Sequence, residues 1–368
     1  MSWRDWADAE AAAIRDAGRW REPRDLDAAG PEGKLFPDGR PVVSFASNDY
    51  LGLTQHPTVV AAAHAALDRW GAGSGSARLI VGSRPVHADL EAALAEWKRA
   101  ERAVLFPTGF ATNLGVLTTF GAPGVLICSD ELNHASIIDG SRLSRARVEV
   151  FHHRDLDHVE HLLTTVPAAR AVVVSDTVFS MDGDVADVDA LAELCARRGA
   201  LLVLDEAHAV LGPDPDLTGR DAVRIGTLSK TVGALGGFVA GPAHLTELIV
   251  NRARSYIFTT ALSPADSAAA LAAVGVIRSA EGCELTAHLH ANVERLRPGH
   301  PSPIVPVVFG DEARTLAAAA ALLDQGMLVP AIRPPTVPPG TSRLRVALSA
   351  AHAPSQIDAL SAAIAGCL

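Results

Sequence analysis

A lysine in a glycine-rich turn and an aspartate at the end of an apolar run have the most distinctive chemistry in this chain. Lys230 lies in Gly226-Thr227-Leu228-Ser229-Lys230-Thr231, among small residues. Partial burial there favours the neutral amine, which can form a Schiff base with an aldehyde. Asp205 follows the apolar residues 201–204, where a carboxylate needs a partner such as a protonated pyridine nitrogen. Together they predict a site for pyridoxal 5'-phosphate (PLP), with a helix N-cap as the alternative role of Asp205.

Two further segments have the chemistry to hold the phosphate of such a cofactor. Gly109 and Phe110 lie between an expected strand and an expected helix, where free amides and the helix dipole suit a dianion. Thr227 and Ser229, beside Lys230, can add hydroxyl contacts. The alternative for Gly109 and Phe110 is an ordinary strand-to-helix turn.

Two histidines complete the candidate site. His208 follows Asp205 by three positions and can hydrogen-bond the phenolic oxygen of PLP. His134, in Asp130-Glu131-Leu132-Asn133-His134-Ala135-Ser136, can stack its ring on the pyridine. Taken alone, either histidine is more often structural, so both assignments depend on Lys230 and Asp205.

The elements that would bring these residues together follow from the apolar pattern. Short apolar runs alternate with helix candidates from about Pro57 to Val239, which predicts an α/β fold with a mostly parallel sheet covered on both faces. Sites in such sheets gather beyond the carboxyl ends of the strands. The expected strands are 42–45, 103–106, 125–128, 148–151, 171–174, 201–204 and 238–239, and the clearest expected helices are 3–19, 86–99 and 188–198.

The pattern of expected helices and strands changes after Pro264. A long alanine-rich helix is followed by strand candidates 304–309 and 344–348 with two helices, which predicts a smaller C-terminal α+β domain. We expect an N-terminal helix and arm over residues 1–45, a large PLP-binding α/β domain over 46–262, and the small domain over 263–368.

Composition excludes several other classes of protein. The 368 residues are 48% hydrophobic and 20% charged, and the net charge of −10 disfavours binding to nucleic acid. The acidic N-terminus lacks the apolar core of a signal peptide, and no apolar stretch is long enough to span a bilayer. Four cysteines without metal-type spacing fit a reducing cytoplasm. The cluster His152, His153, His158 and His161 shows no compact ligand set, so we interpret it as a solvated helix face and expect no metal site.

The sequence Asp205-Glu206-Ala207-His208 is also the signature of DEAH-type nucleic-acid-dependent NTPases. Such motors need an upstream phosphate loop of the form G-x-x-x-x-G-K-[ST], and none is present. The motor alternative is therefore remote, and nucleic-acid-stimulated ATP hydrolysis would support it.

Motifs along almost the whole chain resemble the α-oxoamine synthases, PLP enzymes of fold type I (the aspartate aminotransferase-like fold). They are Ser47-Asn48-Asp49-Tyr50-Leu51-Gly52-Leu53, Gly109-Phe110-Ala111-Thr112-Asn113, Asn133-His134-Ala135-Ser136, Val178-Phe179-Ser180-Met181-Asp182-Gly183-Asp184, Asp205-Glu206-Ala207-His208, Thr227-Leu228-Ser229-Lys230 and Ile332-Arg333-Pro334-Pro335-Thr336-Val337-Pro338. Their order along the chain makes this resemblance far more specific than any single glycine pattern.

The resemblance implies roles for individual residues. It makes Lys230, His134 and Asp205 catalytic. The implied cofactor-binding residues are Gly109, Phe110, His134, Ser180, Asp205, His208, Thr227 and Lys230. The implied substrate-binding residues are Arg19 (or Arg21), Asn48, His134, Arg333, Thr336 and Arg345, with Asn48 and Arg345 on the amino acid carboxylate and the others toward the acyl chain.

The reaction implied is a decarboxylating condensation of an amino acid with an acyl thioester. The segment 332–338 favours L-alanine and a pimeloyl thioester, carried on CoA or acyl carrier protein. Glycine C-acetyltransferase and 5-aminolevulinate synthase are the alternatives within the family. A homodimer is implied as well, because the fold completes its site across a two-fold axis. The chain departs from the family at Ala209, usually glycine, and in the short stretches between Asp205 and Lys230 and over 282–301.

Overall fold

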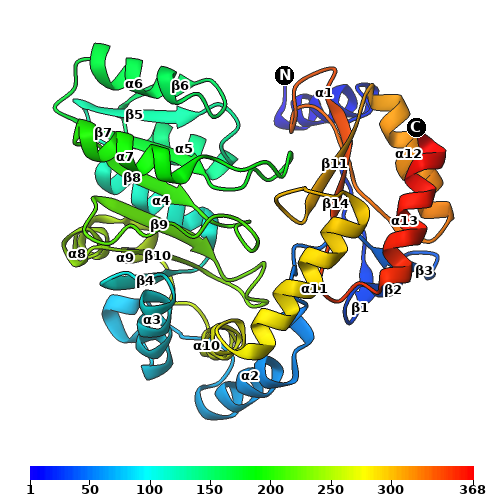
Figure 1. Ribbon diagram of the computed structural model, residues 1–368, viewed down its shortest axis with the longest axis horizontal. Helices are drawn as coiled ribbons and strands as arrows, with labels where there is room; N and C mark the ends of the chain where they lie inside the picture. Colours follow the sequence, from blue (N-terminus) through cyan, green and yellow to red (C-terminus); the bar gives the residue numbers. More distant parts are fainter.

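A seven-stranded sheet forms the centre of the computed structural model, which describes residues Met1–Leu368 (Figure 1). The strand order is β4-β10-β9-β8-β7-β5-β6, and only β10 runs antiparallel to its neighbours. The prediction of a mostly parallel sheet is therefore confirmed. The strands are β4 (Arg102–Phe106), β5 (Val125–Asp130), β6 (Arg147–Phe151), β7 (Arg170–Asp176), β8 (Leu201–Asp205), β9 (Ala222–Thr227) and β10 (Gly237–Gly241).

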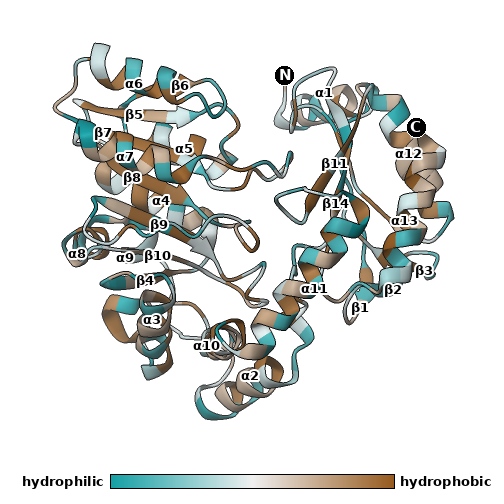
Figure 2. Ribbon diagram, in the orientation of Figure 1, coloured by the Kyte–Doolittle hydropathy of each residue, from teal (hydrophilic) through white to brown (hydrophobic).

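Helices cover both faces of this sheet because its central strands are apolar on both sides (Figure 2). Leu126 and Cys128 of β5 pack with α6 and α7, whereas the alternate residues Val125 and Ile127 pack with α4 and α5. The helices around the sheet are α3 (Pro85–Trp97), α4 (Gly109–Phe120), α5 (Ala135–Leu143), α6 (Leu156–Thr165), α7 (Val188–Arg198), α8 (Ala243–Arg252) and α9 (Arg254–Ile257).

The two ends of the chain meet in a second body, on the right of Figure 1. Strands β1 (Leu26–Ala28), β2 (Glu32–Leu35) and β3 (Arg40–Ser44) form a sheet with β12 (Met327–Leu328), which pairs with β3 in parallel. The strands β11 (Ile304–Gly310), β14 (Ser342–Ala347) and β13 (Ala331–Ile332) form a third sheet. The remaining helices are α1 (Trp3–Asp16), α2 (Pro57–Trp70), α10 (Pro264–Ile277), α11 (Ala280–Leu296), α12 (Glu312–Asp324) and α13 (Pro354–Cys367), with short turns Leu53–Gln55 and Arg78–Gly82.

The helix expected after Pro264 begins there, with the Ser263 hydroxyl accepting from the Asp266 amide. None of the helices combines the length and the apolar character needed to cross a bilayer. The domain boundaries after residues 45 and 262 stay a prediction.

Two sequence-based interpretations need correction. Gly226 and Thr227 lie at the end of strand β9 and not in a turn. The apolar pattern does not predict this strand, because Arg224 interrupts it. The histidine cluster does not share a solvated helix face. His153 lies in the turn after β6, only 21% of its side chain is exposed, and it contacts Asp130 and Asp184, since these two carboxylates draw the ring inward.

Candidate active site

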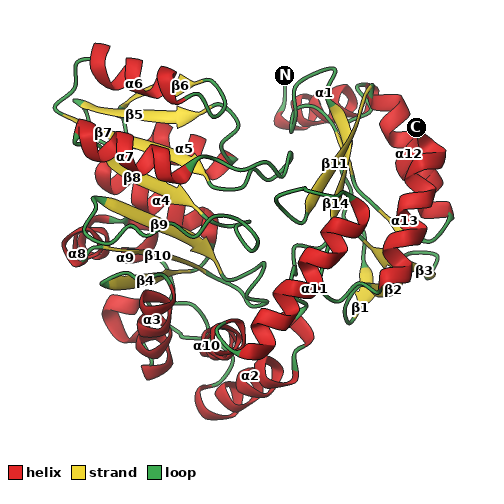
Figure 3. Ribbon diagram, viewed as in Figure 1, coloured by secondary structure: helices red, strands yellow, loops and turns green.

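Adjacent strand ends bring the predicted polar residues together. Asp176 ends β7 and Asp205 ends β8, and the two are register partners. Lys230 lies three residues beyond the end of β9, the next strand of the sheet. Figure 3 shows the arrow of β5 pointing toward the second body, and β7, β8 and β9 run parallel to β5, so these residues face the second body. The expectation that they gather beyond the carboxyl ends of the strands is confirmed.

Asp205 is held by two donors. Its Oδ2 accepts from Asn113 Nδ2 at 2.7 Å and its Oδ1 from the Ala207 amide at 2.9 Å, while the residue is only 5% exposed. These two bonds fix the plane of the carboxylate. The amide Nδ2 of Asn113 also donates to Ser136 Oγ at 3.0 Å, so the carboxylate is tied through α4 to the start of α5.

His134 lies at that start and caps α5. Its Nδ1 is 2.7 Å from Ser136 Oγ, and its amide donates to Asp176 Oδ2 at 3.1 Å. Burial lowers the pKa of His134, and the nearby Asp205 only partly opposes this. Burial, followed by the charge of Asp205, raises the pKa of Asp176 well above its usual value.

The side chains of Lys230 and His208 are in direct contact. Lys230 Nζ lies 2.8 Å from His208 Nε2. Burial lowers the pKa of Lys230, although the Asp205 and Asp176 charges oppose the shift. Burial also lowers the pKa of His208 well below its usual value, and the Lys230 charge adds to this. The pair therefore favours a neutral amine beside a neutral imidazole.

A second set of bonds runs from His208 to Arg345. His208 Nδ1 is 2.6 Å from the hydroxyl of Tyr50, which donates to Asn48 Oδ1 at 3.0 Å. Arg345 Nη2 donates to the same oxygen at 3.1 Å. Arg345 Nε donates to the backbone oxygen of Ser180 at 2.5 Å. The predicted residues Asn48, Ser180 and Arg345 therefore meet beside Lys230.

The predicted phosphate cradle is assembled where α4 begins. Gly109 and Phe110 start this helix, so their amides have no partner within it. A Cβ added to Gly109 would lie 3.3 Å from Cβ of Thr227, and one added to Gly237 would lie 2.6 Å from the Gly109 amide nitrogen. The Phe110 ring centroid is 6.5 Å from that of His134. Close backbone packing thus places these amides beside the Thr227 hydroxyl.

The residues present fit PLP. A buried carboxylate, a lysine with a lowered pKa, an imidazole and a helix start with free amides form the donor set that this cofactor needs. Asp205 would hold the pyridine nitrogen, Lys230 the aldehyde carbon, and Gly109, Phe110 and Thr227 the phosphate.

Arg19, Arg333 and Thr336 form a separate cluster. Arg333 Nη1 donates to the Gly18 oxygen at 3.1 Å, and the Thr336 amide donates to the Arg333 oxygen at 3.0 Å. Arg19 and Arg333 approach Glu312 within 3.8 and 3.7 Å. No hydrogen bond joins this cluster to the hydrogen-bonded series that runs from Arg345 through Asn48, Tyr50 and His208 to Lys230.

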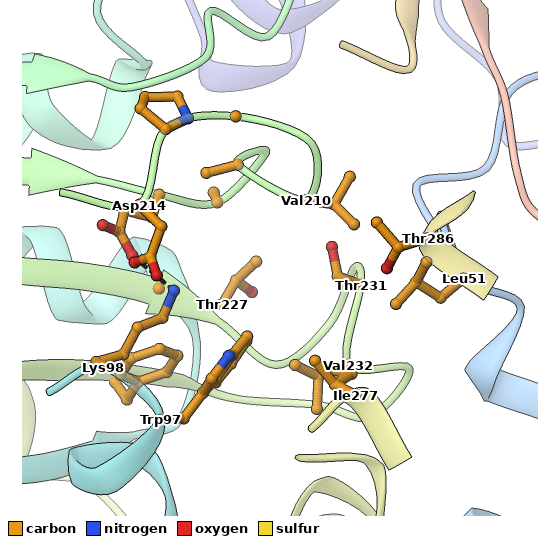
Figure 4. Close-up of a pocket in the computed structure, with 17 residues that line it drawn as sticks. Leu51, Trp97, Lys98, Val210, Asp214, Thr227, Thr231, Val232, Ile277 and Thr286 are labelled. Carbon is orange, nitrogen blue, oxygen red and sulfur yellow. Dashed lines mark ion pairs between the residues drawn. The ribbon is translucent and has the colours of Figure 1, made fainter. Parts of the chain in front are cut away.

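A cavity of about 200 Å³ adjoins the site beneath residues 206–214 (Figure 4). Ala209 and Thr227 line it, and Lys98 contributes its ammonium group, 2.8 Å from Glu206 Oε2. Arg224 pairs with both Glu206 and Asp214. These ion pairs anchor the short segment between Asp205 and Lys230 to the end of α3 and to β9.

Motifs and geometry together define a PLP enzyme, and comparisons with known proteins specify it further. Residues 40–364 match aminotransferase class I and II, and the chain belongs to this family. It is 49% identical to an 8-amino-7-oxononanoate synthase of Anaeromyxobacter dehalogenans (strain 2CP-1), over 99% of this chain and 96% of the relative. The same name belongs to a Burkholderia thailandensis relative, 46% identical over 98% and 96% of the two chains.

Solved structures share the fold of this chain. A serine palmitoyltransferase of Sphingomonas wittichii superposes with a TM-score of 0.90 at 30% identity, covering 99% of this chain and 96% of that one. A Francisella tularensis 8-amino-7-oxononanoate synthase, at 23% identity and a TM-score of 0.74, shares the fold and covers 88% and 97% of the two chains. The protein is a PLP-dependent enzyme of the acyltransferase type, so the tetrad at 205–208 is not that of a nucleic-acid motor.

Sequence reasoning missed two residues of the site. Tyr50 and Asn113 lie within the family motifs, but the sequence alone gives neither of them a role. Each becomes visible through a contact far along the chain, since Tyr50 meets His208 and Asn113 meets Asp205.

Proposed function

We propose that the protein is an 8-amino-7-oxononanoate synthase of biotin synthesis. It would condense L-alanine with a pimeloyl thioester and release 8-amino-7-oxononanoate, CO2 and the free thiol. The identity of 49% across 99% of the chain carries the proposal. The adjoining Lys230, His208 and Asp205 support it, because they supply the base and the carboxylate that this chemistry requires.

The chain's own residues divide the work. When bound, PLP supplies an electron sink that makes the Cα–H bond of an amino acid acidic. Lys230 Nζ would take the Cα proton, since burial lowers its pKa toward the working pH. Neutral His208 accepts a hydrogen bond from Lys230 and keeps the amine near the reacting carbon. His134, which caps α5 and donates its amide to Asp176, would position the acyl donor.

Two arginine groups would bind the two carboxylates of the reaction. Arg345 and Asn48 are beside Lys230, where they would grip the alanine carboxylate and so orient its Cα–H bond. Arg333, Thr336 and Arg19 would shape the acyl site. Arg19, and not Arg21, reaches the Arg333 cluster through Glu312, which favours Arg19 for this role.

A homodimer is part of the proposal. In the segment 79–81, Leu79 is 51% exposed, Ile80 73% and Val81 70%. Phe258 is also 70% exposed. Exposed apolar groups of this size are typical of surfaces that pair with another chain. A cytoplasmic location is supported by four cysteines that form no disulfide.

Purified protein with PLP tests the proposal directly. L-alanine with pimeloyl-CoA or pimeloyl-acyl carrier protein should give a product with the mass of 8-amino-7-oxononanoate. Matched reactions contain glycine with acetyl-CoA, glycine with succinyl-CoA, and L-serine with palmitoyl-CoA. Faster turnover in any of these three would overturn the assignment and point to another acyltransferase of the family.

A further inference from the structure

His153 lies between two carboxylates outside the set of residues that the proposed reaction uses. Its Nδ1 is 3.0 Å from Asp130 Oδ1, and its Nε2 is 2.6 Å from Asp184 Oδ2. The ring meets Phe179 edge-on, with 4.3 Å between centroids. A ring that contacts carboxylates through both nitrogens donates twice, so this geometry selects the protonated imidazolium.

The Asp130 side of this bridge leads to His134. Asp130 ends β5 and is 2% exposed, and its Oδ1 also accepts from the Leu132 amide at 2.9 Å. Its Oδ2 accepts from the Arg154 amide at 2.9 Å. Asp130 thus fixes the start of the segment 131–134, which ends at His134.

The Asp184 side leads to Ser180 and Arg345. Asp184 closes the hairpin 178–185, where the Phe179 amide donates to the Asp184 oxygen at 3.0 Å and Val178 pairs with Val185. The tip of this hairpin carries Ser180, whose backbone oxygen accepts from Arg345. His153 therefore bridges the two loops that border the site with its ring, and Arg154 adds a second, longer link, since its amide donates to Asp130 and its Nη1 lies 3.4 Å from Asp184 Oδ2.

The second body holds the same hairpin from the other side. Ser302 Oγ donates to the Gly183 oxygen at 2.7 Å, and Arg343 pairs with Asp182. Gly183 has φ of +69°, and a Cβ there would collide with the Ile304 oxygen. The contacts with Ser302 and Arg343 hold the hairpin against the second body. The His153 ring links the hairpin to the end of β5 through hydrogen bonds.

We infer that His153 is a positioning residue, which as an imidazolium clamps the segment 131–134 and the hairpin 178–185 so that His134, Ser180 and Arg345 keep their places around the substrate. The inference rests on the proposed function for what these three side chains do. The clamp itself can be tested without substrate or cofactor.

The charges around His153 favour the protonated form. Asp130, Asp184 and Glu131 face it, and Glu131 Oε1 accepts from its amide at 2.8 Å. The opposing groups are Arg154, 3.4 Å from Asp184, and His300 of the small domain, whose pKa burial lowers. Burial alone would lower the pKa of His153, but its hydrogen bonds to Asp130 and Asp184 outweigh this and raise the pKa to about 9.

The sign of the pH effect follows from that shift. The folded-state pKa lies above the unfolded value, so the clamp stabilises the protein fully below about pH 6.5 and loses its effect as the pH rises through about 9. In protein labelled with ¹⁵N in histidine, the His153 ring should titrate near pH 9. Titration of this ring near pH 6.5 would overturn the proposal.

Amide hydrogen exchange with His153→Gln tests the clamp. Protection factors should fall in both 131–134 and 178–185, while the strands of the central sheet stay protected. Asp184→Asn is the second variant, since 31% of that side chain is exposed and its loss should loosen only the hairpin. The matched control is His161→Gln, an exposed helix residue in the same region. Unchanged protection in both segments, or an equal loss throughout the protein, would refute a positioning role.

Kinetics separate this inference from the proposed function. With whichever substrates the protein turns over, His153→Gln should lower kcat/KM by up to about a hundredfold and remove the decline in rate above pH 9. If pimeloyl thioesters prove inert while the exchange result holds, the clamp stands and only the substrate assignment fails. An alkaline decline in His153→Gln identical to that of the wild type would contradict the clamp.

Discussion

Lys230 Nζ lies 2.8 Å from Nε2 of His208, and the direction of hydrogen bonding between them is set by a residue on the far side of the imidazole. The Tyr50 hydroxyl gives its only hydrogen to Asn48, so it accepts from His208 Nδ1. The Nε2 atom of the neutral ring is then left as an acceptor for Lys230. This orientation keeps the amine lone pair free to act on the substrate.

Replacement of Lys230 by alanine should abolish both covalent attachment of PLP and turnover. The visible absorbance of the PLP-loaded protein should disappear, and borohydride reduction should leave the peptide containing residue 230 unlabelled. Lys34→Ala, an exposed lysine of β2, is the control and should behave as the wild type. A labelled peptide elsewhere in Lys230→Ala would show that another amine holds the cofactor.

Substitutions of Arg345 and Arg333 should raise the KM for different substrates. Arg345→Lys keeps a charge but loses the planar fork that reaches both Asn48 and the Ser180 oxygen, so the KM for L-alanine should rise about tenfold or more. Arg333→Lys should instead raise the KM for the acyl thioester. An interchange of these two effects would reassign the carboxylate site to Arg333.

The sequence predicted the sheet better than it predicted the site. Runs such as 201–204 are short and apolar throughout, which is typical of a strand buried on both faces of a parallel sheet, so β8 could be predicted locally. The strand β9 could not be predicted locally, because it contains the charged Arg224. Ion pairs with Glu206 and Asp214 allow this arginine to be buried, and the local pattern does not reveal them.

The polar network depends on contacts between distant parts of the chain. Asn113 and Asp205 are 92 residues apart, and Tyr50 and His208 are 158 apart. Local periodicity carries no information about such pairs. The motifs containing Tyr50 and Asn113 were recognised, but their place in the site required the fold.

Asp176 should destabilise the cofactor-free protein at neutral pH. Its folded-state pKa is raised by burial and by Asp205, so the folded state binds a proton that the unfolded chain releases. Stability is therefore lost as the pH rises from about 4 toward the raised pKa. Asp176→Asn removes this dependence, and its melting temperature should exceed that of the wild type by more at pH 8 than at pH 5. Asp68→Asn, on the exposed side of α2, should show no such trend. An equal difference at both pH values would contradict the protonated state of Asp176.

Swapping the residues at positions 113 and 205 should restore the stability of the protein without restoring its catalysis. In Asp205→Asn the new amide nitrogen faces the Asn113 amide, so two buried donors confront each other at a cost of about 1–3 kcal/mol. The double variant N113D/D205N reverses the bond, with Asn at 205 donating to Asp at 113, and the Ser136 hydroxyl, which accepts from Asn113 in the wild type, can rotate to donate to the new carboxylate. Urea denaturation should therefore show a loss of stability in the single variant and recovery in the double one.

Catalysis should not recover with stability in that double variant. The carboxylate then lies in α4 and no longer at the end of β8, so the pyridine nitrogen would lose its partner. Exchange of the Cα hydrogen of L-alanine with deuterated solvent should stay about a hundredfold or more below the wild-type rate in both variants. Wild-type exchange in the refolded double variant would show that the charge at position 205 serves the fold alone.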